Sequence, residues 1–275
     1  GSKISALAFQ PPAVTYMHVK NRIIWIRTAR NTSIPAFYID RKAKVTLLFS
    51  HGNAEDLGMI WEWFIEFSRE VHVNVLAYDY DGYGKTNGTP SEQSCYQDID
   101  ACYEFLSDTL NIPPENIVLY GRSLGSGPSC YLAERLNKEQ IKLGGLILQA
   151  PLMSIFRVVF NFRFTMPYDI FPNIDRICNL TACPVFVVHG IKDEVVPFWN
   201  GQGLFLATPI HLRAKPLWVQ DGCHNNLEQI LYADGVFFRE FVEFLSEWVP
   251  IYSSSLATRQ NRRYSGISGR SVVSY

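Results

Sequence analysis

The chain has 275 residues, of which 47% are hydrophobic, 14% aromatic and 19% charged. This composition allows a full hydrophobic core to be buried and excludes a disordered or low-complexity chain. The 25 basic and 26 acidic residues leave a formal net charge of -1, so no overall field favours nucleic acid or an anionic membrane. No segment reaches the roughly 18 apolar residues of a membrane-spanning helix, so we expect a globular protein.

The first predicted element along the chain is a β-hairpin, because segments 22–27 and 36–39 flank the turn-forming Asn31-Thr32-Ser33. From residue 44 onward, short runs rich in β-branched residues alternate with longer periodic segments, which predicts βαβ units and a mostly parallel sheet. The predicted buried strands are 45–49, 73–78, 117–120, 145–149, 185–189 and 217–219. The predicted helices are 57–70, 91–110 with Ser91 as N-cap, 127–136, 199–207 and 234–248.

Residues 1–250 are predicted to form a single α/β domain with helices on both faces of the sheet. Within it, the long connection 151–183 forms either a small cap or an ordinary packed crossover helix, and both interpretations use the same aromatic residues. Segment 251–275 contains four arginines, seven serines and no acid, so we expect it to be an appended tail. The aromatic residues of the connection are Phe156, Phe160, Phe162, Phe164, Tyr168 and Phe171.

The six cysteines lie in predicted helices, strands and short loops, and none forms a CxxC pair. This usage is typical of reduced thiols, so we expect a cytoplasmic protein. The cysteines are Cys95, Cys102, Cys130, Cys178, Cys183 and Cys223.

The strongest functional signal is Gly121-Arg122-Ser123-Leu124-Gly125, which follows strand 117–120 and precedes helix 127–136. This is a G-x-S-x-G nucleophile elbow in the strand-turn-helix context that it requires. A serine on such a tight turn projects its hydroxyl from the sheet, and the helix N-terminus that follows stabilises negative charge. We interpret Ser123 as a catalytic nucleophile.

A serine nucleophile needs a base, and in α/β-hydrolases the acid and then the histidine follow the serine along the chain. Asp193 comes after strand 185–189 and His224 after strand 217–219, where the carboxyl ends of parallel strands build a site. His224 is expected to accept the serine proton and Asp193 to orient the imidazole. Glu194 is the alternative acid.

The loop His51-Gly52-Asn53-Ala54 follows an early strand and has a different predicted role. An H-G loop at this place turns a backbone N–H into the site, where it forms an oxyanion hole with the N–H after the nucleophile. We expect Asn53 and Leu124 to supply these donors, with Ala54 as the alternative to Asn53. His51 itself and the remaining histidines are expected to be structural.

Two further patterns resemble a phosphate-binding loop and a metal site but lack residues that these sites require. Gly84-Lys85-Thr86 resembles part of a phosphate loop, but Asp79 stands where the motif requires glycine. Asp79 and Asp81 have no histidine or cysteine at metal-ligand spacing, so we interpret them as structural loop carboxylates. The sequence predicts no metal and no cofactor.

Beyond these motifs, the chain resembles the α/β-hydrolase domain-containing proteins of subfamily seventeen, membrane-associated serine hydrolases that remove palmitoyl groups from proteins. The resemblance covers nearly the whole chain and includes segments without catalytic motifs. It implies the α/β-hydrolase fold and the triad Ser123, Asp193 and His224. The matching segments are Leu7-Ala8-Phe9, Pro11-Pro12, Thr15-Tyr16, Phe49-Ser50-His51-Gly52-Asn53-Ala54, Tyr78-Asp79-Tyr80, Gly82-Tyr83-Gly84, Pro151-Leu152-Met153-Ser154, Phe171-Pro172-Asn173-Ile174, Asp193-Glu194-Val195 and Pro216-Leu217-Trp218-Val219.

The sequence also departs from that family. The family carries a cysteine-rich, palmitoylated segment ahead of the Leu7-Ala8-Phe9 stretch, which is absent or trimmed here, so we expect at most a peripheral contact with the cytosolic face of membranes. Arg122 stands where those relatives usually have an uncharged side chain, and the tail is unlike theirs.

The first functional hypothesis is a serine hydrolase that cleaves long-chain acyl thioesters on proteins through an acyl-enzyme, with Phe156, Phe160 and Phe164 lining the acyl groove. A carboxylesterase or lipase for small or lipid esters is the alternative, because a triad does not distinguish a thioester from an oxygen ester. A catalytically silent binding protein is the third hypothesis, and the complete triad order argues against it. The expected partner is an acylated protein or a small acyl ester, without nucleic acid.

Overall fold

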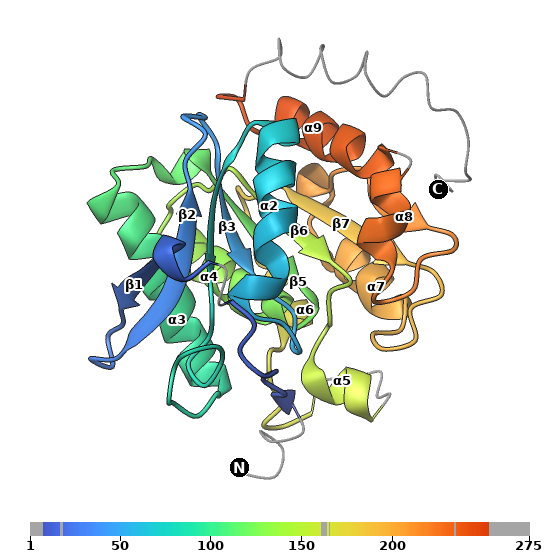
Figure 1. The fold of residues 1–275 in the computed structure, drawn as a ribbon. Helices are drawn as coiled ribbons and strands as arrows, with labels where there is room; N and C mark the ends of the chain where they lie inside the picture. The colour runs from blue at the N-terminus through green and yellow to red at the C-terminus, as the bar shows by residue number, and fades with distance from the viewer. Residues whose placement is uncertain (1–7, 17–18, 161–163, 165, 234, 253–275) are drawn as a thin grey trace.

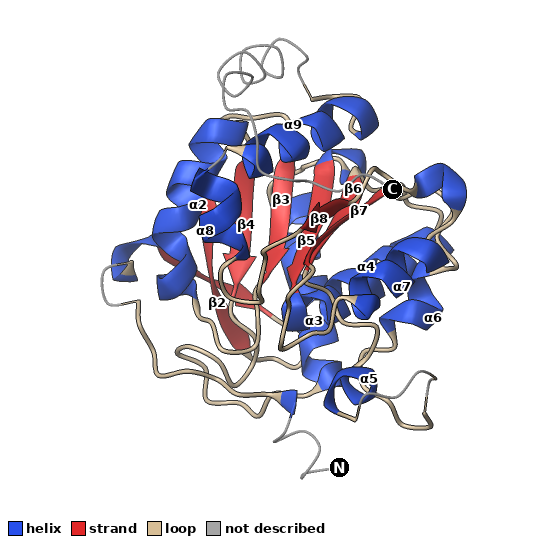
Figure 2. Cartoon of the chain, turned by 90° about the vertical axis from the view of Figure 1, so that its right-hand side faces the viewer, coloured by secondary structure: helices blue, strands red, loops and turns tan. Residues whose placement is uncertain are grey.

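The computed structural model describes residues 8–16, 19–160, 164, 166–233 and 235–252. A twisted sheet lies between two layers of helices (Figures 1 and 2), which confirms the predicted α/β class. Phe162 and most of the predicted tail lie outside the described residues. The strands are β1 Ile23–Arg27, β2 Ser33–Ile39, β3 Thr46–Ser50, β4 Asn74–Tyr78, β5 Ile117–Arg122, β6 Gly145–Gln149, β7 Val185–Gly190 and β8 Leu217–Val219.

The eight described strands follow the order β1-β2-β4-β3-β5-β6-β7-β8. β1 and β2 form the predicted antiparallel hairpin, in which Ile23 lies opposite Phe37 and Asn31 turns the chain with a φ of 67°. β2 also pairs antiparallel with β4, and every later pair in the order is parallel. The carboxyl ends of β3, β5, β6, β7 and β8 therefore meet at one edge of the sheet.

The helices cover both faces of the sheet. α2 and α9 share a hydrophobic cluster with one face, whereas α3, α4, α6 and α7 pack on the other. α5 lies at the edge of the molecule, beyond the carboxyl end of β6 (Figure 1). The helices are α2 Leu57–Val71, α3 Glu92–Glu104, α4 Ser126–Lys138, α5 Ile155–Val159, α6 Asn173–Ile177, α7 Trp199–Ala207, α8 Leu227–Ala233 and α9 Val236–Trp248, with short helical turns η1 Lys20–Arg22, η2 Phe105–Thr109, η3 Pro114–Asn116, η4 Ser123–Gly125 and η5 Ile210–Leu212.

The predicted bounds of β6, β8 and α7 are confirmed residue for residue, and Ser91 caps α3 by accepting a hydrogen bond from the Ser94 N–H at 3.0 Å. The predicted helix 91–110 is α-helical only to Glu104, after which the chain widens into a π-helical turn. The predicted helix 234–248 begins only at Val236, because Gly235 has a φ of 61° and separates α9 from α8.

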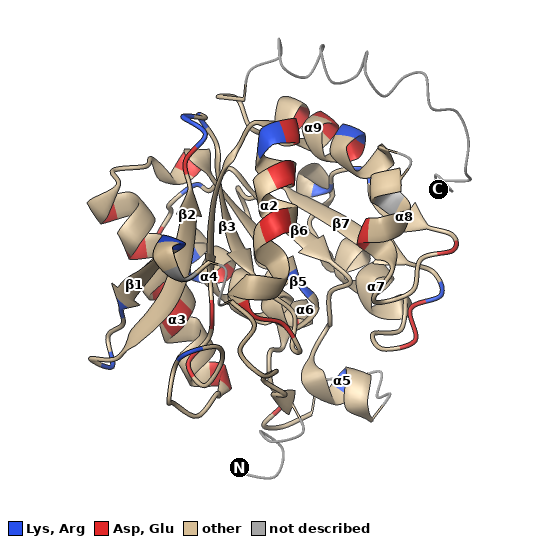
Figure 3. Ribbon diagram, in the orientation of Figure 1, with Lys and Arg blue, Asp and Glu red and all other residues tan. Residues whose placement is uncertain are grey.

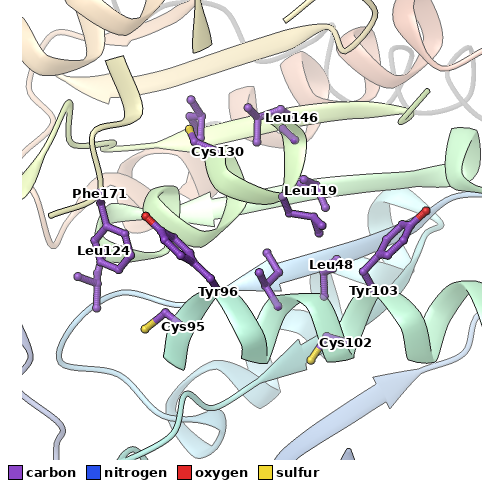
Figure 4. Close-up of a cluster of buried hydrophobic side chains, with 14 of the residues drawn as sticks. Leu48, Cys95, Tyr96, Cys102, Tyr103, Leu119, Leu124, Cys130, Leu146 and Phe171 are labelled. Carbon is purple, nitrogen blue, oxygen red and sulfur yellow. The ribbon is translucent and has the colours of Figure 1, made fainter. Parts of the chain in front are cut away.

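The core of one sheet face reaches the predicted elbow. Figure 4 shows Leu124 beside Phe171 in a cluster that also holds Tyr96, Leu48 and Leu119. The Leu124 side chain is only 2% exposed, and the rings of Tyr96 and Phe171 meet edge to face at 5.7 Å. Burial of the side chain that follows Ser123 anchors the elbow in the core.

The elbow itself is tightly packed against β3. Ser123 has a φ of 49°, a left-handed conformation that is uncommon for a residue with a side chain. A Cβ atom at Gly121 would lie 2.5 Å from the Gly125 carbonyl oxygen, and one at Gly125 would collide with the carbonyl oxygen of Ser50. The turn can be this sharp only because both flanking residues lack a side chain.

This packing predicts the effect of adding one methyl group to the elbow. Gly125→Ala should lower the free energy of unfolding by about 1–3 kcal/mol, because the new atom meets rigid backbone. The matched control is Gly203→Ala in α7, where the added atom meets the flexible end of Met153 and alanine favours the helix. Urea titrations of both variants measure the difference, and equal stabilities would contradict the packing argument.

Candidate active site

The sheet edge at the carboxyl ends of the strands brings Ser123 and His224 together, although 101 residues separate them. Ser123 follows β5 and lies at the start of η4, and His224 lies in the loop after β8. The serine Oγ is 3.1 Å from the His224 Nε2, within hydrogen-bond distance. The hydroxyl therefore faces the nitrogen that could accept its proton.

The third predicted residue, Asp193, contacts the other side of the same imidazole. Its Oδ2 lies 2.8 Å from the His224 Nδ1, and its Oδ1 accepts hydrogen bonds from the N–H groups of Val195 and Val196 at 3.0 and 2.8 Å. The alternative acid Glu194 is exposed, and its carboxylate accepts the His224 backbone N–H at 3.3 Å rather than contacting the ring in the described residues. The structure thus places Asp193 beside the imidazole ring.

A second histidine supports Asp193. The buried His189 Nε2 lies 2.9 Å from the Val196 carbonyl oxygen and 3.3 Å from the Asp193 Oδ2. Burial opposes the charge of Asp193, but the hydrogen bonds of His189 and His224 outweigh it and hold the pKa of this carboxyl well below its ordinary value. His189 lies at the end of β7, four residues before Asp193, and its expected structural role therefore places it in contact with the site.

The predicted oxyanion loop, residues 51–54, is held in place by buried side-chain contacts. The His51 ring is buried, lies 4.3 Å from the Tyr80 ring between centroids, and places its Nδ1 2.7 Å from the Gly52 carbonyl oxygen. The Asn53 Oδ1 accepts hydrogen bonds from the Tyr83 hydroxyl at 2.6 Å and the Gln10 N–H at 2.9 Å. Burial lowers the pKa of His51, which suits a neutral, structural ring.

A pocket of about 560 Å³ opens at Ser123. The predicted donors Asn53 and Leu124, and the alternative Ala54, all line it together with His224. Part of the lining is apolar and comes from α5 and the preceding chain. Besides Ala54 and Leu124, the apolar lining residues are Ala8, Met59, Leu152, Ile155, Val158, Val159, Val195 and Val196.

The three phenylalanines predicted to line an acyl groove are not among these lining residues. Phe156 is buried in the core, whereas Phe160 and Phe164 are 49% and 60% exposed. For Phe156 the reason is the helical spacing of α5, because positions 155, 158 and 159 share the face toward the pocket and position 156 faces the core, whereas Phe160 and Phe164 follow the end of the helix. The same helical spacing can be read from the sequence, but the prediction of lining residues relied on aromatic character instead.

The remaining candidates lie apart from Ser123. Asp79 is fully buried, its pKa is raised by burial, and its carboxylate accepts the Leu57 N–H at 3.1 Å. Asp81 lies 3.6 Å from the Arg30 guanidinium. Among the described residues, no three His, Cys, Asp or Glu side chains are grouped as metal ligands would be. In the same part of the chain, no helix is both long and apolar enough to cross a membrane.

Comparisons with known proteins agree with this architecture. A family model described as serine aminopeptidase, S33, matches residues 41–174. An esterase from Pyrococcus furiosus shares the fold with a TM-score of 0.67 at 20% identity, over 88% of this chain and 99% of that one. The Rhodococcus esterase RhEst1 has a TM-score of 0.64 at 17% identity, over 82% of this chain and 99% of that one.

Relatives found by sequence share more identity with this chain than these two structures do. The mouse α/β-hydrolase domain-containing protein 17C is 38% identical over 83% of this chain and 68% of its own length. The human α/β-hydrolase domain-containing protein 17B is 36% identical over 90% of this chain and 92% of its own length. These relationships confirm the resemblance inferred from the motifs: the chain is a hydrolase and belongs to the α/β-hydrolase domain-containing protein 17 family.

Proposed function

We propose that the protein is a serine hydrolase in which Ser123 is the nucleophile, His224 the general base and Asp193 the orienting acid. The observation that carries this proposal is the continuous chain of contacts from the Asp193 Oδ2 through the imidazole to the Ser123 Oγ, at 2.8 and 3.1 Å. This arrangement fixes the imidazole so that its free nitrogen faces the hydroxyl.

The reaction proceeds in two halves. The Ser123 Oγ attacks the acyl carbonyl carbon while its proton passes to the His224 Nε2, and the collapsing tetrahedral intermediate expels a thiol or alcohol that takes this proton. Water then attacks the acyl-enzyme, gives a proton to His224, and releases the fatty acid as the proton returns to the serine oxygen. In both halves the N–H groups of Asn53 and Leu124 stabilise the oxyanion.

The substrate that we propose is a long-chain acyl thioester on a protein. The apolar wall of Leu152, Ile155, Val158 and Val159 supports it, because a pocket of about 560 Å³ at the nucleophile can shelter an acyl chain from water. Acidic and basic residues are both spread along the ribbon in Figure 3, so charge alone does not point to a nucleic-acid or strongly charged partner. A carboxylesterase for small esters is the second candidate, since the same triad serves both bonds.

The proposed roles predict a specific pattern of variants. Ser123→Ala should abolish hydrolysis and fluorophosphonate labelling, and His224→Ala should be about as damaging. Asp193→Asn should lower turnover by about 10⁴-fold, because it favours the wrong imidazole tautomer. The matched control is Glu194→Gln, which changes the neighbouring carboxylate and should stay within about threefold of wild type. A crippled Glu194→Gln would reassign the acid.

The pocket predicts a dependence on acyl length. Each methylene buried against the apolar wall adds about 0.8 kcal/mol at most, so kcat/KM should climb from acetyl to octanoyl to palmitoyl thioesters. Val158→Phe should shorten the pocket and reduce the efficiency for palmitoyl more than for acetyl. Phe164→Ala is the control outside the pocket lining and should leave this profile unchanged. The measurement is kcat/KM for each thioester at concentrations below its micelle threshold. A wild-type kcat/KM that does not change with acyl length would favour the small-ester hydrolase.

A further inference from the structure

Arg122 lies at the carboxyl end of β5, immediately before Ser123. Its Nη1 is 2.8 Å from the Oε1 of Glu55 and 2.8 Å from the Oε1 of Glu228. The three side chains are 15%, 13% and 23% exposed, so the ion pairs are largely shielded from water. One cation thus joins two carboxylates from different parts of the chain.

Glu55 connects this cation to the oxyanion loop. Its other oxygen, Oε2, accepts the Gly52 N–H at 2.6 Å, one residue before Asn53. A Cβ atom at Gly52 would lie 2.9 Å from this oxygen, so the loop and the carboxylate are in close contact. The position of Glu55 therefore helps to determine where the loop backbone lies.

Glu228 connects the cation to the histidine loop. It lies in the first turn of α8, four residues after His224. Its Oε1 also lies 3.4 Å from the Gln149 Nε2, and Gln149 accepts a hydrogen bond from the Tyr120 hydroxyl. Burial, together with the nearby Glu55, raises the pKa of Glu228 above its ordinary value, and Arg122 opposes this shift by favouring the charged form of the carboxyl.

We propose that Arg122 is a positioning residue that holds the oxyanion loop and the His224 loop against Ser123 through Glu55 and Glu228. This proposal rests on the proposed function. Because both carboxylates contact the same nitrogen, loss of the cation leaves two partly buried like charges close together. Their repulsion separates the two loops, and small displacements of the Asn53 N–H and of the imidazole slow the attack by Ser123.

The test compares Arg122→Gln with a matched variant, Arg135→Gln in α4. Arg135 also joins two carboxylates, with its Nε 3.0 Å from Asp100 and its Nη1 2.9 Å from Glu139, and it does not line the pocket. In Arg122→Gln, the rate of fluorophosphonate labelling and the kcat for an acetyl thioester should fall about 10- to 100-fold, with KM within about twofold. Arg135→Gln should label at the wild-type rate, and thermal midpoints report any loss of stability.

Two further variants separate positioning from folding. Arg122→Lys places one charged nitrogen between the carboxylates again and should recover most of the labelling rate. Glu228→Gln removes the ion pair between Arg122 and residue 228 while the cation remains. It should slow labelling about fivefold, and it tests the proposal even if Arg122→Gln does not fold.

The outcomes are distinct. Wild-type labelling rates in Arg122→Gln and Glu228→Gln would overturn the role of Arg122, as would a lysine variant as slow as the glutamine variant. An Arg135→Gln variant slowed as much as Arg122→Gln would reduce the effect to general stability and overturn it too. Wild-type protein that does not label at Ser123 would instead overturn the proposed function.

Discussion

The close approach of the elbow to β3 is the constraint on which the site depends. Gly125 lies so near the Ser50 carbonyl that no side chain fits between them, and Ser123 is held in a left-handed conformation. Such a conformation costs of order 1–3 kcal/mol and persists only where the surroundings enforce it. The buried Leu124 side chain supplies that enforcement from the core, and Ser123 consequently lines the pocket at the sheet edge.

The same approach brings distant loops together. Because Ser50 pairs with Gly121 in the parallel register of β3 and β5, the loop after β3 must begin beside the elbow. At the other side, the Lys192 N–H donates to the Gly222 carbonyl oxygen at 2.9 Å, which fixes the loops after β7 and β8 to each other. The alignment of Asp193, His224 and Ser123 therefore follows from strand order, with side-chain contacts making the final adjustment.

The sequence was most informative where local chemistry decides the structure. Buried apolar strands between glycine and proline, such as β6 and β8, can be recognised from residue type alone, and the elbow follows from its two glycines and the strand before it. The contact of Asp193 with His224 was predictable because parallel strands end at one edge. The exact donors of the oxyanion hole remain predictions, although the structure places Asn53 and Leu124 in the pocket lining.

Other features depend on tertiary packing and carried little local signal. α5 and α6 have five residues each, too few to be stable alone, so their formation depends on the surfaces that they cover. The sequence does not show which face of such a short helix turns toward the pocket. The prediction therefore followed aromatic character, whereas in the structure the face of α5 that carries Ile155 and Val158 lines the pocket. Likewise, nothing in the spacing of Glu55, Arg122 and Glu228 indicates that they meet.

Two charge-compensated groups flank Ser123, and they differ in what they can do. The pair of Asp193 and His224 includes a ring that must gain and lose a proton in each proposed catalytic cycle. The group of Arg122, Glu55 and Glu228 contains a guanidinium that stays charged in proteins. Burial opposes this charge, but the two carboxylates outweigh burial and raise the pKa of Arg122 above its ordinary value. A permanently charged group keeps its geometry while the imidazole gains and loses a proton in the proposed cycle, so proton transfer and loop placement fall, in the proposed roles, to separate residues on either side of the nucleophile.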